Sequence, residues 1–256
     1  MQCGHNMTHE RRFFAESLDV SGGRVTFSEH DAGHMRRSLR LHSGSKVVAI
    51  DETGAAYEVE LEKVTDRRAA GRIVKQLSQA EPVTTEMWLI QGLPKGRQKT
   101  DLIVRQATEV GVDHIRFVPT ERSNAVLRRD RAADRLDRWN RVVREAAAQC
   151  RRSRVPTVGA YDSLGDAVGA LPDGCAMLVA WEDEPDAGLT ECIEQVGAEP
   201  IAVAVFIGPE GGFSTAECEL LKAAGGHTFR LGSTVLRTET AAAVISALVR
   251  HHLGLM

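Results

Sequence analysis

The apolar run at residues 201–207 has none of the polar alternation that a half-exposed strand shows. Such a run is typical of a β-strand buried on both faces of a sheet. It ends abruptly at the glycine-bearing loop 208–212. A helix is expected to begin at Ser214, because Ser214 and Glu217 fit the Ser-x-x-Glu capping box, and to end at the glycine pair 225–226.

A second unit repeats this order further along the chain. Residues 227–231 form the expected strand, residues 232–240 a loop, and the alanine-rich stretch that follows a helix running to about Arg250. Because glycine has no side chain, a glycine at a strand end lets a ligand approach the backbone closely. The two loops are therefore a candidate ligand site.

Strands and helices alternate throughout residues 87–256. Apolar runs predict further strands at 87–91, 114–119 and 176–180, and helices are expected over about 98–110 and 132–150. This alternation predicts an α/β domain with a mostly parallel sheet covered by helices. In such sheets ligands bind at the carboxyl ends of the strands, which is where both loops fall.

Residues 1–77 have a different pattern, with short strands separated by turn residues. The apolar Tyr57, Val59 and Leu61 alternate with polar neighbours, as in a strand with one solvated face. One helix is expected near residues 30–41. The pattern predicts a small β-barrel, and residues 78–86, which lack periodicity, are the expected linker to the second domain.

Composition narrows the protein class. No apolar run approaches the roughly 20 residues of a membrane span, and the first residues lack an apolar signal core, so we expect a cytoplasmic protein without membrane association. The five cysteines form no C-x-x-C pair, so neither a metal site nor a disulfide framework is expected.

The net charge of −3 conceals a basic segment. Residues 116–154 hold twelve arginines, no lysine and five acidic residues, a net +7 that leaves −10 on the rest of the chain. Guanidinium groups bind phosphate through two-point contacts, so this segment favours a nucleic-acid surface. A solvated helix face is the alternative interpretation.

Glycine loops before helices also occur in nucleotide-binding proteins, but the spacing here differs. The chain contains neither G-x-G-x-x-G after a strand nor G-x-x-x-x-G-K-[ST], and GLPKGRQKT has those residue types in another order. The hydrolase motifs H-E-x-x-H and G-x-S-x-G are also absent. Dehydrogenase, P-loop and common hydrolase chemistry are thus disfavoured.

Four stretches, in order, resemble a known family: LPKGRQKTDLIVRQATEVGV (93–112), RWNRVVREAAAQCRRSRVP (138–156), GPEGGFS (208–214) and LGSTVLRTETA (231–241). They are similar to the SPOUT-class RNA methyltransferases, and within that class to the family that methylates N3 of a uridine in small-subunit (16S) ribosomal RNA. RRFF at 11–14 resembles the opening strand of that family's PUA-like RNA-binding barrel.

The resemblance implies an N-terminal PUA-like barrel followed by a SPOUT domain at 87–256 with a deep trefoil knot. It also implies S-adenosyl-L-methionine as the cofactor, 16S rRNA of the small ribosomal subunit as the substrate, a homodimer whose interface lies beside the cofactor, and no metal. Since knots are very rare, this feature rests on the resemblance alone. A SPOUT ribose 2′-O methyltransferase and a non-catalytic rRNA-binding assembly factor are the alternatives.

The resemblance places the cofactor against the backbone of both loops and the end of strand 176–180. Glu210 or Glu239 would favour its positively charged sulfur. The expected cofactor-binding residues are Ala180, Trp181, Gly208, Pro209, Glu210, Gly211, Leu231, Gly232, Leu236, Arg237 and Thr238.

Three residues are candidates for catalysis, because uracil N3 carries a proton that must leave before the nitrogen attacks. Arg237 would stabilise the developing negative charge, and Glu210 or Glu109 would accept the proton. Each has a structural alternative: a salt bridge within the loop for Arg237, a helix-dipole partner for Glu210, and a packing or salt-bridge role for Glu109.

RNA would be held by surface cations that contact phosphates without reading sequence. The low aromatic content favours recognition of folded rRNA over stacking along a single strand. The RNA-binding candidates are Arg11, Arg12, Arg37, Arg40, Lys95, Arg122, Arg144, Arg151 and Arg152.

Overall fold

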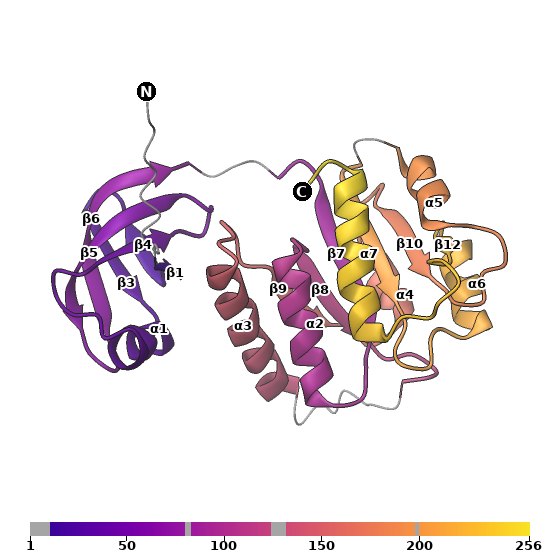
Figure 1. The fold of residues 1–256 in the computed structure, drawn as a ribbon, viewed down its shortest axis with the longest axis horizontal. Helices are drawn as coiled ribbons and strands as arrows, with labels where there is room; N and C mark the ends of the chain where they lie inside the picture. Colours follow the sequence, from indigo (N-terminus) through magenta and orange to yellow (C-terminus); the bar gives the residue numbers. More distant parts are fainter. Residues whose placement is uncertain (1–10, 80–82, 124–131, 198–199) are drawn as a thin grey trace. The chain divides into compact units, whose positions relative to one another are not determined.

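A computed structural model describes residues 11–79, 83–123, 132–197 and 200–256, which fall into two compact units (Figure 1). The first unit extends to Pro82 and includes Ala147–Arg154, and the second comprises Val83–Ala146 and Val155–Met256. Residues 124–131 of the basic segment, residues 80–82 of the expected linker, and Cys3 lie outside the described residues.

The first unit is built on a curled six-stranded sheet with the order β1-β4-β5-β6-β3-β2. The predicted alternation is confirmed in β5, where Tyr57, Val59 and Leu61 are buried. The helix expected near 30–41 is found as α1 followed by a π-helix, η1. The elements are β1 (Arg12–Phe14), β2 (Ser17–Asp19), β3 (Arg24–Phe27), α1 (Glu29–Gly33), η1 (His34–Ser38), β4 (Lys46–Ile50), β5 (Ala56–Val64) and β6 (Ala69–Ser78).

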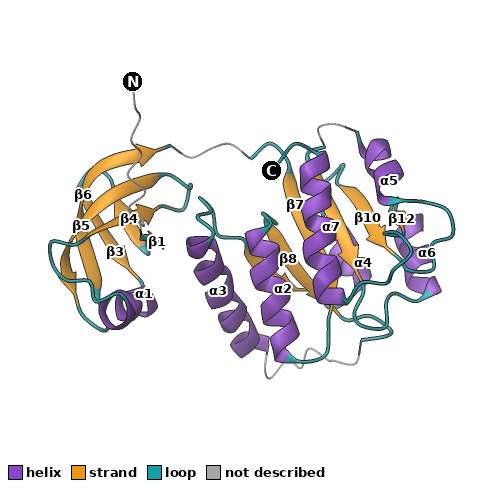
Figure 2. Cartoon of the chain, in the orientation of Figure 1, coloured by secondary structure: helices purple, strands orange, loops and turns teal. Residues whose placement is uncertain are grey.

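The second unit contains the predicted parallel sheet, with the order β12-β10-β11-β7-β8-β9 and every pairing parallel (Figure 2). Its strands are β7 (Glu86–Gly92), β8 (His114–Val118), β9 (Thr157–Ala160), β10 (Ala176–Ala180), β11 (Ala202–Ile207) and β12 (His227–Phe229). Its helices are α2 (Arg97–Glu109), α3 (Ala132–Gln149), α4 (Leu164–Gly169), α5 (Leu189–Val196), α6 (Thr215–Ala223) and α7 (Thr238–His252).

Helices cover both faces of this sheet. One face carries α2, α3, α5 and α7, whose apolar side chains form a continuous core with the strands. The other face carries α4 and α6. All six residues of β11 are buried, as the unbroken apolar run predicts.

The strand order reverses between β7 and β11. From β7 the chain adds β8 and β9 on one side, then crosses over to β10, and β11 is inserted between β10 and β7. The carboxyl ends of β7 and β11 therefore lie side by side, at the switch point where parallel sheets bind ligands.

Of the two loop-to-helix junctions, the first agrees with the expectation and the second differs slightly from it. The Ser214–Glu217 capping box is confirmed, with the Ser214 amide donating to the Glu217 carboxylate over 2.9 Å and the Glu217 amide donating to Ser214 Oγ over 3.3 Å. The second loop is shorter than predicted, because α7 begins at Thr238 with Arg237 as its N-cap residue. The Thr238 hydroxyl turns away from the loop and donates to the Gly208 carbonyl over 2.7 Å, which fixes the start of the helix.

Candidate cofactor site

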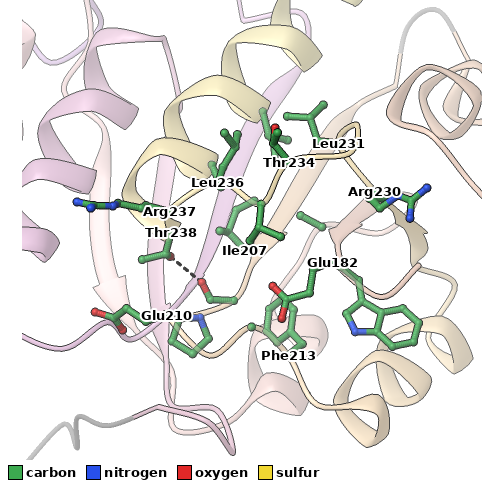
Figure 3. Close-up of a pocket in the computed structure, with 18 of the residues that line it drawn as sticks. Glu182, Ile207, Glu210, Phe213, Arg230, Leu231, Thr234, Leu236, Arg237 and Thr238 are labelled. Atoms are coloured by element: carbon green, nitrogen blue, oxygen red, sulfur yellow. Dashed lines mark hydrogen bonds between the residues drawn. The ribbon is translucent and has the colours of Figure 1, made fainter. Parts of the chain in front are cut away.

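A cavity of about 530 Å³ opens at the carboxyl ends of β10, β11 and β12 (Figure 3). Its walls are the segment after β10, the loop after β11, and the loop between β12 and α7. Both glycine-bearing loops predicted from the sequence thus line one cavity. Of the expected cofactor-binding residues, those that line it are Ala180, Trp181, Gly208, Pro209, Glu210, Leu231, Gly232, Leu236, Arg237 and Thr238.

Gly208 is required by the tight fold of the first loop. A Cβ atom at this position would lie 2.7 Å from Gly212 C and 2.9 Å from Phe213 N, which are backbone atoms that cannot rotate away. Gly92, at the end of β7, faces the same loop, because a Cβ there would lie 2.5 Å from Pro209 Cδ. At this wall of the cavity, the backbone of the loop after β11 therefore packs closely against itself and against the end of β7, with no room for a side chain at Gly208 or Gly92.

Glu210 is held in place by the segment that leads into α2 and by the first turn of that helix. Its carboxylate accepts hydrogen bonds from the Lys95 amide, at 3.1 Å, and from Lys99 Nζ, at 2.7 Å. Burial alone would raise the pKa of Glu210, but the hydrogen bonds from Lys99 and from backbone amides lower it below its ordinary value. A carboxylate with a lowered pKa is a weak base, so this geometry favours a structural role for Glu210 over proton acceptance.

Arg237 and Glu239 are less constrained. In Figure 3 the Arg237 side chain lies on the opposite side of the cavity from Arg230. Arg237 is exposed, and it forms no ion pair with any of the residues that the structure describes, so the loop salt bridge considered as its alternative role is not found there. Glu239 lines the cavity, and its Oε2 atom is buried without a hydrogen-bond partner in the described part of the chain.

The segment after β10, which forms the third wall of the cavity, contains a buried carboxylate. Glu184, only 8% exposed, accepts a 2.5 Å hydrogen bond from Thr228 Oγ1, and Lys222 Nζ lies 3.8 Å from it and 5.1 Å from the centre of the Trp181 ring. Burial alone would raise the pKa of Glu184. The hydrogen bond from Thr228, further hydrogen bonds from backbone amides and the positive charge of Lys222 outweigh this effect and lower the pKa. Glu182 extends towards Phe213 (Figure 3).

Two site predictions do not fit the geometry. Glu109 is the exposed last residue of α2, at the opposite end from the Lys95–Lys99 segment that contacts the site, and it does not line the cavity. A 13-residue helix spans roughly 20 Å, so Glu109 cannot reach this cavity from its own chain. Gly211 also lies outside the lining; it is exposed, and its carbonyl accepts a hydrogen bond from Arg122 Nη1 at 3.0 Å.

Several site residues were missed in the sequence. Lys99 and Phe213 lie within recognised motifs, and Arg230 lies in the predicted strand 227–231, but none had been assigned a role in the site. Gln91 is also missing from the prediction, since a polar residue at the end of an apolar strand gives no signal of what it contacts. Its amide Nε2 lies 3.1 Å from the Gly208 carbonyl oxygen and 2.8 Å from Thr238 Oγ1.

Comparisons with known proteins place this site in a family. Residues 81–250 match the RNA methyltransferase domain family, and residues 27–74 match the RNA methyltransferase PUA domain. The chain is 30% identical over 238 residues to the ribosomal RNA small subunit methyltransferase E of Mycobacterium tuberculosis, covering 91% of this chain and 88% of that protein. The chain belongs to the ribosomal RNA small subunit methyltransferase E family. A Bacillus subtilis protein of the same name is 27% identical over 81% of the chain and 82% of its own length.

A solved structure supports the same relationship. The Neisseria gonorrhoeae ribosomal RNA small subunit methyltransferase E, bound to S-adenosyl methionine, aligns with a TM-score of 0.82 and 26% identity, over 95% of this chain and 98% of that one. The expected family, the PUA-like and α/β fold, and the class of RNA methyltransferase that uses S-adenosylmethionine are thereby confirmed. The trefoil knot stays a prediction.

The cavity suits a ligand with the chemistry of S-adenosylmethionine. Its volume lies within the roughly 300–1,000 Å³ of small-molecule sites. Ile207, Phe213 and Leu236 offer apolar surface, and the glycine loops expose backbone groups. Trp181 Nε1 is a buried donor with no partner in the described residues, and the carboxylates of Glu182 and Glu239 bring negative charge to a cavity that would receive a sulfonium cation.

The cationic RNA-binding candidates are distributed over both units. Lys95 and Arg122 both contact the first glycine loop, through the bonds to Glu210 and Gly211 described above. Most of the set is exposed, while Arg12 and Arg152 are partly buried. Among the residues that the structure describes, no helix is long and apolar enough to cross a membrane, and no group of three potential metal ligands occurs.

Proposed function

We propose that this chain transfers a methyl group from S-adenosylmethionine to N3 of a uridine in small-subunit ribosomal RNA. The observation that carries the proposal is the cavity at the carboxyl ends of the parallel strands, walled by two glycine-bearing loops, in a chain whose relatives are named ribosomal RNA small subunit methyltransferases. The bound cofactor would supply a methyl group on a positively charged sulfur. The chain's own residues must position the uracil and remove its N3 proton.

Arg237 is suited to stabilise the uracil as its proton leaves. Loss of the N3 proton places negative charge on the two neighbouring carbonyl oxygens, and a guanidinium can donate to one of them. Arg237 lines the cavity with no ion pair among the described residues, so its donors are available for this role. We propose that Arg237 binds a uracil carbonyl.

Glu239 replaces Glu210 as our candidate for the proton acceptor. The Glu210 carboxylate is engaged by Lys95 and Lys99, whereas Glu239 lines the same cavity and retains an oxygen without a partner in the described chain. The kcat values of two variants separate the candidates. Glu239→Gln is expected to lower kcat strongly, because the amide cannot accept the proton, and Glu210→Gln to lower it much less. The assignment fails if Glu239→Gln retains the parent kcat.

Apolar side chains on α2 and α7 support the implied homodimer. These two helices pack together, and Leu102, Val244 and Leu248 are 37%, 36% and 42% exposed, with Val235 of the adjacent loop at 76%. We propose that a second copy of the chain covers this surface beside the cavity. Sedimentation of the parent chain and of Leu248→Asp tests this proposal, and a monomeric parent chain would contradict it.

Identification of the methylated nucleoside tests the proposed function. The protein is incubated with S-adenosylmethionine labelled in its methyl group and with either isolated small subunits or naked rRNA, and the RNA is digested and the labelled nucleoside identified. The expected product is 3-methyluridine, with small subunits as the better substrate. Label on a ribose 2′-oxygen would show a 2′-O methyltransferase, and RNA binding without any label would show a non-catalytic factor.

A further inference from the structure

The side-chain amide of Gln91 connects three segments that meet behind the cofactor cavity. Gln91 is the penultimate residue of β7, is completely buried, and does not line the cavity. Its Nε2 atom lies 2.8 Å from Thr238 Oγ1, 3.0 Å from the Gly92 carbonyl oxygen, 3.1 Å from that of Gly208 and 3.3 Å from that of Ile207. Thr238 and Gly208 belong to two different walls of the cavity, which meet at the hydrogen bond between these residues.

The orientation of this amide follows from its surroundings. Three of the four neighbouring groups are carbonyl oxygens, which only accept hydrogen bonds, so the nitrogen end of the amide must face them. The Thr238 hydroxyl donates to Gly208 and therefore accepts from Gln91. The three groups form a closed polar network: Gln91 to Thr238, Thr238 to Gly208, and Gln91 to Gly208.

A buried glutamine at this position lowers the stability of the fold, so good packing is not the reason for its presence. The Gln91 Oε1 atom is buried with no hydrogen-bond partner among the described residues, and a buried polar atom without a partner destabilises a fold. A methionine would fill a similar volume without this cost. In return for this loss of stability, the Gln91 side-chain amide holds the Gly208 carbonyl and Thr238, the first residue of α7, in a fixed position relative to each other.

We propose that Gln91 is a positioning residue for cofactor binding, which holds the loop after β11 and the start of α7 in their binding arrangement before the cofactor enters. The inference rests on the proposed use of this cavity for S-adenosylmethionine. Ordering the loops in advance removes an entropic cost from binding, so the Gln91 amide stabilises the complex although Gln91 itself does not line the cavity.

The test uses Gln91→Met, Thr238→Val and the double variant of the full chain, with Thr85→Val as the matched control. Thr85 Oγ1 donates to the Pro200 carbonyl over 2.8 Å, which links the starts of the same two strands, β7 and β11, at the end away from the cavity. Dissociation constants for S-adenosylmethionine are measured by calorimetry, KM for cofactor and for RNA by methyl transfer, and stability by denaturant unfolding.

We expect Gln91→Met and Thr238→Val each to weaken cofactor binding about tenfold and to raise KM for the cofactor but not KM for RNA. The double variant should be little worse than either single variant, because both changes break one network. Thr238→Ser, which keeps the hydroxyl, should restore binding. Thr85→Val should lose stability and keep cofactor affinity, which separates positioning from general stability.

Two results would overturn the inference: full cofactor affinity in Gln91→Met, or affinity losses that add in the double variant. If Gln91→Met does not fold, the comparison of Thr238→Val with Thr238→Ser decides the question, and equal cofactor affinity in these two variants contradicts the proposal. A parent chain that binds no S-adenosylmethionine would instead refute the proposed function itself.

Discussion

Replacing Gly208 with alanine tests the claim that bare backbone forms the cavity wall. The added Cβ would lie 2.7 Å from Gly212 C, 2.8 Å from Gly212 Cα and 2.9 Å from Phe213 N, whereas ordinary contacts begin at 3.4 Å. The loop must therefore open by roughly 0.5–0.7 Å. All three obstructing atoms belong to the backbone, so no side-chain rotation relieves the clash.

The magnitude follows from the cost of overpacking, about 1–3 kcal/mol. If the loop relieves that strain by moving the cavity wall, cofactor binding loses the same free energy. The dissociation constant then rises roughly 5- to 150-fold. Calorimetric titration with S-adenosylmethionine measures the loss. Gly169→Ala is the matched control, because a Cβ atom at Gly169, the last residue of α4, would meet nothing within 4 Å, and this variant should bind like the parent. Parent-like affinity in Gly208→Ala would refute the reasoning.

Three further predictions concern other parts of the chain. Arg151→Glu with Arg152→Glu should weaken RNA binding and flatten its salt dependence at unchanged cofactor affinity; an unaltered salt slope contradicts this. Burial raises the pKa of Cys218 to about 12, so its thiol should resist alkylation until the chain unfolds, as site-resolved mass spectrometry would show. The lowered pKa of Glu184 adds stability that is complete above its ordinary value of 4.5 and is lost as the pH falls through the folded pKa. In Glu184→Gln the free energy of unfolding, measured by denaturant titration at a series of pH values, should therefore fall less steeply as the pH is lowered.

Local patterns in the sequence predicted the elements around the site well. The apolar run of β11 indicated a buried strand, the Ser214–Glu217 pair indicated the start of α6, and glycines marked both loops. These features depend on neighbours within a few residues, so the printed sequence contains the necessary information. The short elements β9, α4 and α5 were missed, because four to eight residues carry too little periodicity.

Long-range features could not be predicted in this way. The insertion of β11 between β10 and β7 is decided by packing of the whole sheet, and it brings Gln91 within hydrogen-bond distance of a carbonyl 117 residues away. The same limitation explains why the distance of Glu109 from the cavity was not foreseen. Its motif contains residues of the site, but the helix carries Glu109 to its far end.

A crystal structure of the chain with S-adenosylhomocysteine, the demethylated cofactor product, tests the central claim most directly. We predict that the ligand lies between the loop after β11 and the loop before α7, against the backbone of Gly208 and Leu231. Binding away from Gly208, in the neighbouring cavity beside α5 and the end of α7 that is lined by Leu189, Leu248 and His252, would contradict the account.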